Sequence, residues 1–483
     1  MVTVWIFLNF MTGNHKTSLL TCAENDIISN LPEHLIGSIL ERLPIDDAVR
    51  TSILSKSWRY RWTTMTMLLF DEQFSKKFAE KGAFGRNGFI RTINDVLIPH
   101  NGPISKFSLH IPRIDLDSFQ EVDHTMLLIS RKSVQELVLT NSNSCYELPS
   151  YVSSCSKLRK LELENCIFKP LHKLEVFSNL NHVCLTNIDF GADFCGTLVT
   201  LPQLRVLWLD MCRSVYNFNI KASKLKRLAV IDCPDAMLLR LLDAPCLNMF
   251  CLCFLEPFED FVRVERMNLS RLLSNLPEVK NLFLDGHFLK YLSADGIPKW
   301  LPRAVYSLSN LRLYDFQLSD LDQLNGALCL LRNSPNLERL CIRQSLRVSK
   351  SVPQVPSFWL MWHMTGVDLA KGLRWNVPPF HSSVVEPQVM DYDVGPASNH
   401  LESPNCLDQT LNRLQTVEIV YFEGSRPELL FIKLILAHSP SLVKLTIESE
   451  TFDAHQRLNI AMDVKGFPRA SPKAELFFLN PKP

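Results

Sequence analysis

The fold is decided by the stretch at residues 201–212, which reads LPQLRVLWLDMC and sets Leu204, Leu207 and Leu209 in the pattern L-x-x-L-x-L. The other full copies are Leu158-Leu161-Leu163, Leu225-Leu228-Val230, Leu337-Leu340-Ile342 and Leu442-Leu445-Ile447. Looser copies begin at Ile104, Val134, Leu180, Leu247, Val279 and Leu308. Copies recur about every 20 to 30 residues, so each predicts one short strand whose apolar side chains pack against those of the next copy.

Three cysteines close their repeats at the position where a leucine-rich repeat takes Asn or Cys: Cys166, Cys212 and Cys233. We interpret them as packing residues rather than metal ligands. Segments between the repeats, such as 171–177 and 236–242, contain helix-forming residues that suit an outer wall. The sequence therefore predicts an α/β protein, an irregular leucine-rich-repeat solenoid with a parallel concave sheet.

A second informative stretch is 31–62, which reads LPEHLIGSILERLPIDDAVRTSILSKSWRYRW. Apolar residues recur every four positions after Pro32, and Pro44 ends this first predicted helix. Asp46 and Asp47 offer a cap and negative charge for a second helix, and Ser55 offers a cap for a third. Three helices this short cannot bury all their apolar surface among themselves, so a partner protein is implied.

Leu31-Pro32, Leu43-Pro44, the run Ser52 to Lys56, and Trp58-Arg59 with Trp62 resemble an F-box. In that family the helices dock onto the Skp-type adaptor of a cullin-RING ubiquitin ligase. The resemblance implies that the adaptor is contacted by Leu31, Pro32, Ile36, Leu43, Pro44, Leu54 and Trp58. An amphipathic hairpin at the edge of a larger core is the alternative. A nucleic-acid site at Lys56 and Arg59 to Trp62 is disfavoured by the formal net charge of +1.

Two more segments extend the resemblance. Phe89, Ile93, Val96 and Leu97 form a helical stripe ahead of a turn at Asn101-Gly102-Pro103. Residues 414–450 predict strand, helix and strand, with a capping box at Ser425 and Glu428, and this unit resembles the FBD domain of plant F-box/leucine-rich-repeat proteins. The expected domains are a leader (1–25), F-box (26–72), helical linker (73–103), repeats (104–345), irregular insertion (346–405) and FBD-like unit (406–483).

The chain has 483 residues, and 46% of them are hydrophobic. This length is greater than that of one compact domain, so we expect an elongated or multidomain body. Its N-terminal run MVTVWIFLNFM is too short to span a bilayer and lacks a preceding basic residue, so we expect a disordered leader or a wrongly chosen start codon. The insertion carries Trp359, Trp362 and Trp375, which suit either a docking element or a poorly packed stretch. The 14 cysteines are expected to be mostly reduced, and the protein to reside in the nucleus, the cytoplasm or both, with no membrane contact.

Catalytic motifs are absent from the sequence, including H-E-x-x-H, G-x-S-x-G and the Walker-type glycine loop. The glycine cluster from Gly82 to Gly88 is interpreted as a loop. Cys246, Cys251 and Cys253 lack a matching histidine pair, so no metal is assigned. We expect no catalytic residue, cofactor or metal.

The resemblance implies a substrate-recognition subunit of a Skp-cullin-F-box ubiquitin ligase, with cullin and RING proteins reached through the adaptor and an unidentified protein as target. A non-degradative scaffold or inhibitor and a small-molecule-dependent receptor remain open. Strand alternation predicts the target-facing residues, because side chains between the core leucines point to the concave side. They are Glu162, Glu164, Trp208, Asp210, Phe283, Asp285, Arg312, Tyr314 and Arg343, with Trp208 as the expected anchor.

Overall fold

The structure is a computed structural model, and it describes residues 31–79, 82–113, 119–143, 146–168, 177–190, 198–214, 219–233, 244–254, 269–274, 276–293, 296, 300–344, 394–404, 406–407, 410–449 and 454–479. The expected leader and the three tryptophans of the expected insertion lie outside these residues.

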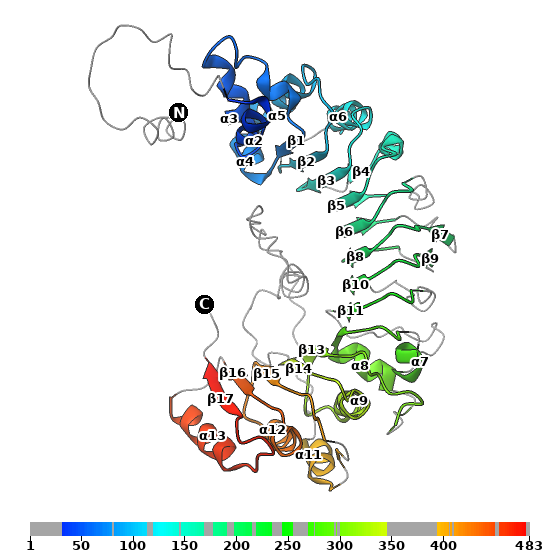
Figure 1. Ribbon diagram of the computed structural model, residues 1–483, viewed down its shortest axis with the longest axis vertical. Helices are drawn as coiled ribbons and strands as arrows, with labels where there is room; N and C mark the ends of the chain where they lie inside the picture. The colour runs from blue at the N-terminus through cyan, green and yellow to red at the C-terminus, as the bar shows by residue number, and fades with distance from the viewer. Residues whose placement is uncertain are drawn as a thin grey trace, which may run out of the picture.

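One parallel sheet runs through the described residues and curves into an open arc (Figure 1). Its strands, in spatial order, are β1 (Met67–Phe70), β2 (Lys106–Ile111), β3 (Glu136–Asn141), β5 (Lys160–Ile167), β6 (His182–Asp189), β8 (Val206–Asp210), β10 (Arg227–Ile231), β11 (Met249–Cys253), β12 (Asn281–Asp285), β13 (Asn310–Phe316), β14 (Arg339–Gln344), β15 (Thr416–Val420), β16 (Lys444–Glu448) and β17 (Glu475–Leu479). A short strand, β4 (Tyr146–Glu147), pairs with β5, and β7 (Leu198–Thr200) pairs with β9 (Asn219–Lys221) apart from the main sheet. The α/β solenoid predicted from the leucine pattern is confirmed.

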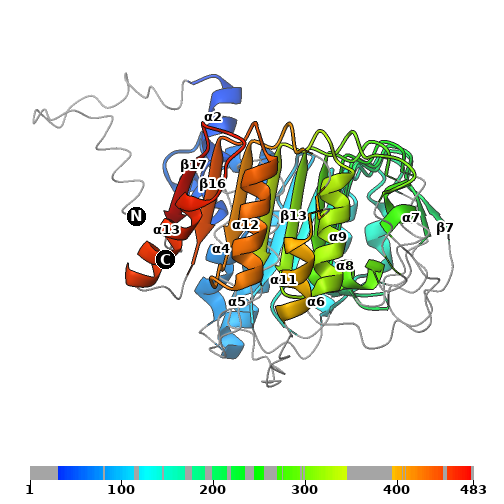
Figure 2. The ribbon, with the colours of Figure 1, turned by 90° about the horizontal axis from the view of Figure 1, so that it is seen from below.

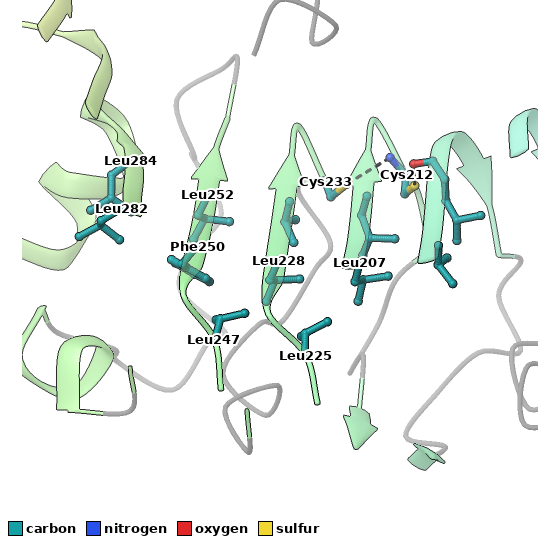
Figure 3. Packing of buried hydrophobic residues seen from close by; sticks show 14 of the residues in the cluster. Leu207, Cys212, Leu225, Leu228, Cys233, Leu247, Phe250, Leu252, Leu282 and Leu284 are labelled. Carbon is teal, nitrogen blue, oxygen red and sulfur yellow. Dashed lines mark hydrogen bonds between the residues drawn. The ribbon is translucent and has the colours of Figure 1, made fainter. Parts of the chain in front are cut away.

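The leucine pattern builds the core because equivalent residues of successive strands lie side by side. Leu207 of β8 pairs in register with Val183 of β6 and Leu228 of β10, and all three are buried. Figure 3 shows this apolar column with the cysteines at the ends of the strands. The Cys212 backbone N–H donates to the Cys233 Sγ at 3.2 Å, and both side chains are fully buried, so the prediction that they are packing residues is confirmed.

Helices cover the convex side of the arc. They include α6 (Gln120–Ser130), the 3-10 helix η3 (Ser150–Ser154), α7 (Leu269–Ser274), α8 (Gly286–Ser293), α9 (Leu321–Arg332), α11 (Val394–Glu402), α12 (Arg426–His438) and α13 (Ala454–Gly466). Figure 2 shows α8, α9 and α12 lying along one face of the sheet. The expected outer-wall segments 171–177 and 236–242 lie outside the described residues, apart from the buried Phe177.

The C-terminal unit continues the same sheet. Strands β15, β16 and β17 pair in parallel with β14 and with one another. The predicted capping box at Ser425 and Glu428 is present at the start of α12. Helix α11, which falls in the expected insertion, packs on α9 and α12 and buries Ala397 and Leu401, so this stretch is part of the folded unit.

Two local predictions were wrong. The glycine cluster is not a loop, because α5 (Gly82–Leu97) begins at Gly82, and this helix packs on α4 (Glu72–Ala79). Ser55 caps no third α-helix: its hydroxyl bonds to that of Ser57 at 2.7 Å, and the chain then forms turns and the 3-10 helix η2 (Arg61–Thr64).

Candidate adaptor and target surfaces

The first candidate surface belongs to the N-terminal helical module, residues 31–65. Its helix α2 (Glu33–Leu40) starts after Pro32, and α3 (Ile45–Arg50) starts after Pro44, since a missing N–H is tolerated at a helix start. The 3-10 helix η1 (Thr51–Ile53) follows directly. The Ser52 hydroxyl donates to the Arg59 carbonyl at 3.0 Å, which holds the segments before and after the turn at Ser55 together.

The helical module is joined to the sheet by polar contacts as well as by chain continuity. The Glu41 carboxylate accepts from the hydroxyl and the N–H of Thr66 at 2.6 and 3.2 Å. The buried His100 ring contacts the Met65 carbonyl at 2.8 Å, and burial lowers the pKa of this histidine, which favours its neutral form. Lys77 of α4 pairs with Asp46 at 2.5 Å. The module is therefore fixed to the first strands of the solenoid.

The predicted adaptor residues fall into two groups. Ile36 and Trp58 are only 1% and 4% exposed, so the expectation that their side chains find no core within the chain is wrong, while their contact with the adaptor stays a prediction. Both side chains pack in a core formed by the rest of the module and the start of the solenoid. This core involves residues distant in sequence, so it was not predicted. Leu31 and Leu43 are half-buried against that core, whereas Pro32, Pro44 and Leu54 are exposed.

Three exposed apolar residues of the helical module were missed by the sequence reading. Ile53 is 84% exposed, Tyr60 68% and Leu35 42%, beside the predicted Leu54 at 50%. Ile53 and Leu54 lie together in the run Ser52 to Lys56, so that run already held the signal. Exposed apolar side chains of this size favour a protein interface.

The second candidate surface is the concave side of the sheet, where strand alternation places the predicted target residues. Trp208 lies on this side but is only 6% exposed, which corrects the expectation that it is displayed. Its row neighbours in register are the small residues Cys184 and Ala229, which leave room for the indole to pack. The buried cluster around it contains Ala229, Ile231, Met249, Cys251, Cys253 and Phe283.

The two predicted aspartates are also buried, Asp210 at 3% and Asp285 at 1% exposure. Asp285 accepts from the N–H groups of Phe254 and Phe288, each at 2.8 Å, and so anchors the start of α8. Burial raises its pKa to about 7 despite these bonds. Phe283 is 2% exposed. The expectation that Asp210, Asp285 and Phe283 are displayed on an open surface is therefore wrong, and their contact with a target stays a prediction.

The remaining predicted target residues are half-buried on the concave side: Glu162, Glu164, Arg312, Tyr314 and Arg343. The structure brings the last three together on the adjacent strands β13 and β14. Glu162 lies on β5, where its carboxylate accepts from Lys160 at 2.9 Å and lies 3.5 Å from the His182 ring. Burial alone would raise the pKa of Glu162, but these partners outweigh it and hold the pKa at about 2.

Within the described part of the chain, no group of three or more His, Cys, Asp or Glu side chains could hold a metal ion. None of the helices there is both long and apolar enough to cross a membrane.

The chain matches three family models: the F-box domain over residues 28–68, the LRR repeats of FBD-associated F-box protein At5g56370 over 122–342, and the FBD over 401–447. F-box/FBD/LRR-repeat protein At1g13570 of Arabidopsis thaliana is 31% identical over 463 residues, covering 94% of this chain and 99% of that protein. The probable FBD-associated F-box protein At1g32375 of the same plant is 24% identical over 480 residues, covering 94% and 100%. A solved internalin of Listeria monocytogenes aligns with 81% of this chain and 95% of its own at 13% identity, with a TM-score of 0.27.

Proposed function

Since this chain belongs to the F-box/FBD/LRR-repeat family, we propose that it is the substrate-recognition subunit of a Skp-cullin-F-box ubiquitin ligase. The helical module binds the Skp-type adaptor, and through it cullin and RING proteins, while the concave side of the solenoid binds a target protein. The role is not catalytic. It raises the effective concentration of the target near a ubiquitin-charged conjugating enzyme, in the nucleus or cytoplasm where such adaptors work.

The observation that carries the proposal is the exposure of Ile53, Leu54 and Tyr60 on a module that is firmly attached to the solenoid. Residues with no role in the chain's own core are free to bury their apolar surface against a partner. Fully burying an isoleucine side chain is worth about 1.5–3 kcal/mol, so one substitution here should change affinity measurably.

The test is adaptor binding by the full chain carrying Ile53→Asp, compared with a matched control, Ile98→Asp. Ile98 is 69% exposed and lies just after α5, outside the helical module. We expect Ile53→Asp to weaken adaptor binding at least tenfold in a titration by calorimetry, while Ile98→Asp binds like the wild type. Retention of wild-type adaptor affinity by a folded Ile53→Asp variant would refute the assignment of this surface.

A further inference from the structure

The kind of side chain on the concave side changes from one end of the arc to the other. On β5 the Glu162 carboxylate is satisfied by Lys160, so this part of the face holds charges that pair with one another. The middle strands carry the buried apolar cluster around Trp208. Beyond it, β13 and β14 carry Arg312 and Arg343.

Arg312 is a half-buried cation that makes no ion pair with a described residue. Its guanidinium lies over the Phe283 ring, 5.7 Å from the centroid, and interacts electrostatically with the Tyr314 hydroxyl. Burial raises the pKa of Tyr314, so that hydroxyl is a neutral acceptor. The Arg312 Nε is buried and finds no hydrogen-bond partner among the described residues. Removing a guanidinium from water without an anion is costly, so this position favours binding of one.

Arg343 supplies a second cation close by. Its guanidinium lies over the Tyr421 ring at 5.0 Å from the centroid, so its direction is fixed. Cys341 pairs in register with Arg312, and Arg343 lies two residues further along the same strand. Strand spacing and rise then separate the two arginine Cα atoms by about 8 Å. Two side chains of this length can reach one carboxylate or two neighbouring ones.

The local charge favours an anion as well. On the next strand Glu418 pairs in register with Cys341 in the row of Arg312, whereas Arg343 pairs with Val420, so β15 sets one carboxylate beside the two guanidiniums. Nucleic acid is a poor fit, because the chain's formal net charge is only +1 and the same concave side carries Glu162 and Glu164. A protein segment with a few acidic side chains matches a basic site of this size.

We propose that Arg312 and Arg343 form a carboxylate-binding subsite that recognises an acidic segment of the target protein. The proposal rests on the function proposed above and specifies the chemistry of its target. Paired guanidiniums bind carboxylates in bidentate geometry, and stacking on Phe283 and Tyr421 holds them in place before the target arrives.

The test uses the full chain in complex with its adaptor and a fluorescently labelled polyglutamate octapeptide as probe, with anisotropy at low salt as the readout. The variants are Arg312→Gln and Arg343→Gln, and the matched control is Arg413→Gln, which removes an exposed arginine from the loop before β15. Two subsite variants keep the test meaningful if one of them folds poorly, and each is checked by circular dichroism. We expect at least tenfold weaker binding for each subsite variant and less than twofold for the control.

Equal weakening by Arg413→Gln would show nonspecific charge attraction and overturn the subsite. Wild-type binding by both folded subsite variants would overturn it too, as would equally tight binding of a polylysine octapeptide. Competition by free glutamate as strong as by the peptide would indicate a small-ligand site instead of a protein-segment site. Adaptor capture by the same samples is measured separately, so loss of the ligase role and loss of the acidic subsite are told apart.

Discussion

Replacing Glu428 with alanine should destabilise the C-terminal unit more than any surface change in it. Glu428 is 2% exposed at the first turn of α12. One carboxylate oxygen accepts from the Glu423 N–H at 3.0 Å and from the Gln344 side-chain amide, and the other accepts from the Ser425 N–H at 2.5 Å. The alanine variant leaves these three donors without an acceptor. At about 1 kcal/mol for each lost bond, the free energy of unfolding should fall by about 3 kcal/mol.

Urea unfolding of the full chain, together with hydrogen exchange across α12, measures this loss. Glu428→Gln should cost about half as much, because one oxygen acceptor remains. The matched control is Glu402→Ala: Glu402 pairs with Arg426 at 2.6 Å, but its side chain is 44% exposed, so the loss should stay below about 1 kcal/mol. If Glu428→Ala costs no more than Glu402→Ala, the capping box is not what holds β14 to the C-terminal unit.

Burial lowers the pKa of His100 below its ordinary value of 6.5, so as the pH falls the unfolded chain binds this proton before the folded chain does. The stability that the neutral His100 contributes should therefore be complete above pH 6.5 and be lost as the pH falls below the lowered pKa. Hydrogen exchange around Met65, which His100 contacts, measured on either side of that pH should show the loss, and unchanged protection would contradict it. Gly326→Ala should destabilise the fold by about 1–3 kcal/mol in urea unfolding, because the new Cβ would lie 2.6 Å from the Leu289 Cγ. Gly37→Ala, where a Cβ meets nothing within 4 Å, should be neutral or stabilising, and equal losses for the two would rule out the packing explanation.

The sequence predicted those features that depend on local spacing. Leu204, Leu207 and Leu209 are core residues because strand alternation and the short turn before the strand fix their direction. The capping box at Ser425 and Glu428 likewise needs only residues three apart, and the structure contains it.

Burial was harder to predict because it depends on residues distant in sequence. Alternation correctly placed Trp208 on the concave side, yet its exposure depends on neighbouring strands, where Cys184 and Ala229 are small enough to let the indole pack. Trp58 was expected to face a partner because the helical module alone offers little core. The contact of that module with the start of the solenoid supplies the missing core.

The helical module and the proposed arginine subsite are connected by one continuous hydrogen-bonded sheet. Strand β1 leaves the helical module and pairs directly with β2, and nine strand-to-strand steps lead from β1 to β13. At about 4.8 Å for each step, the subsite lies about 43 Å along the concave side from the first strand. Every step is a backbone ladder, so under the proposed function the number of repeats sets the distance between the proposed adaptor surface and a target bound at the proposed subsite. A proximity mechanism needs such a fixed separation, because the reach to a target lysine is then selected by geometry and not by a flexible linker.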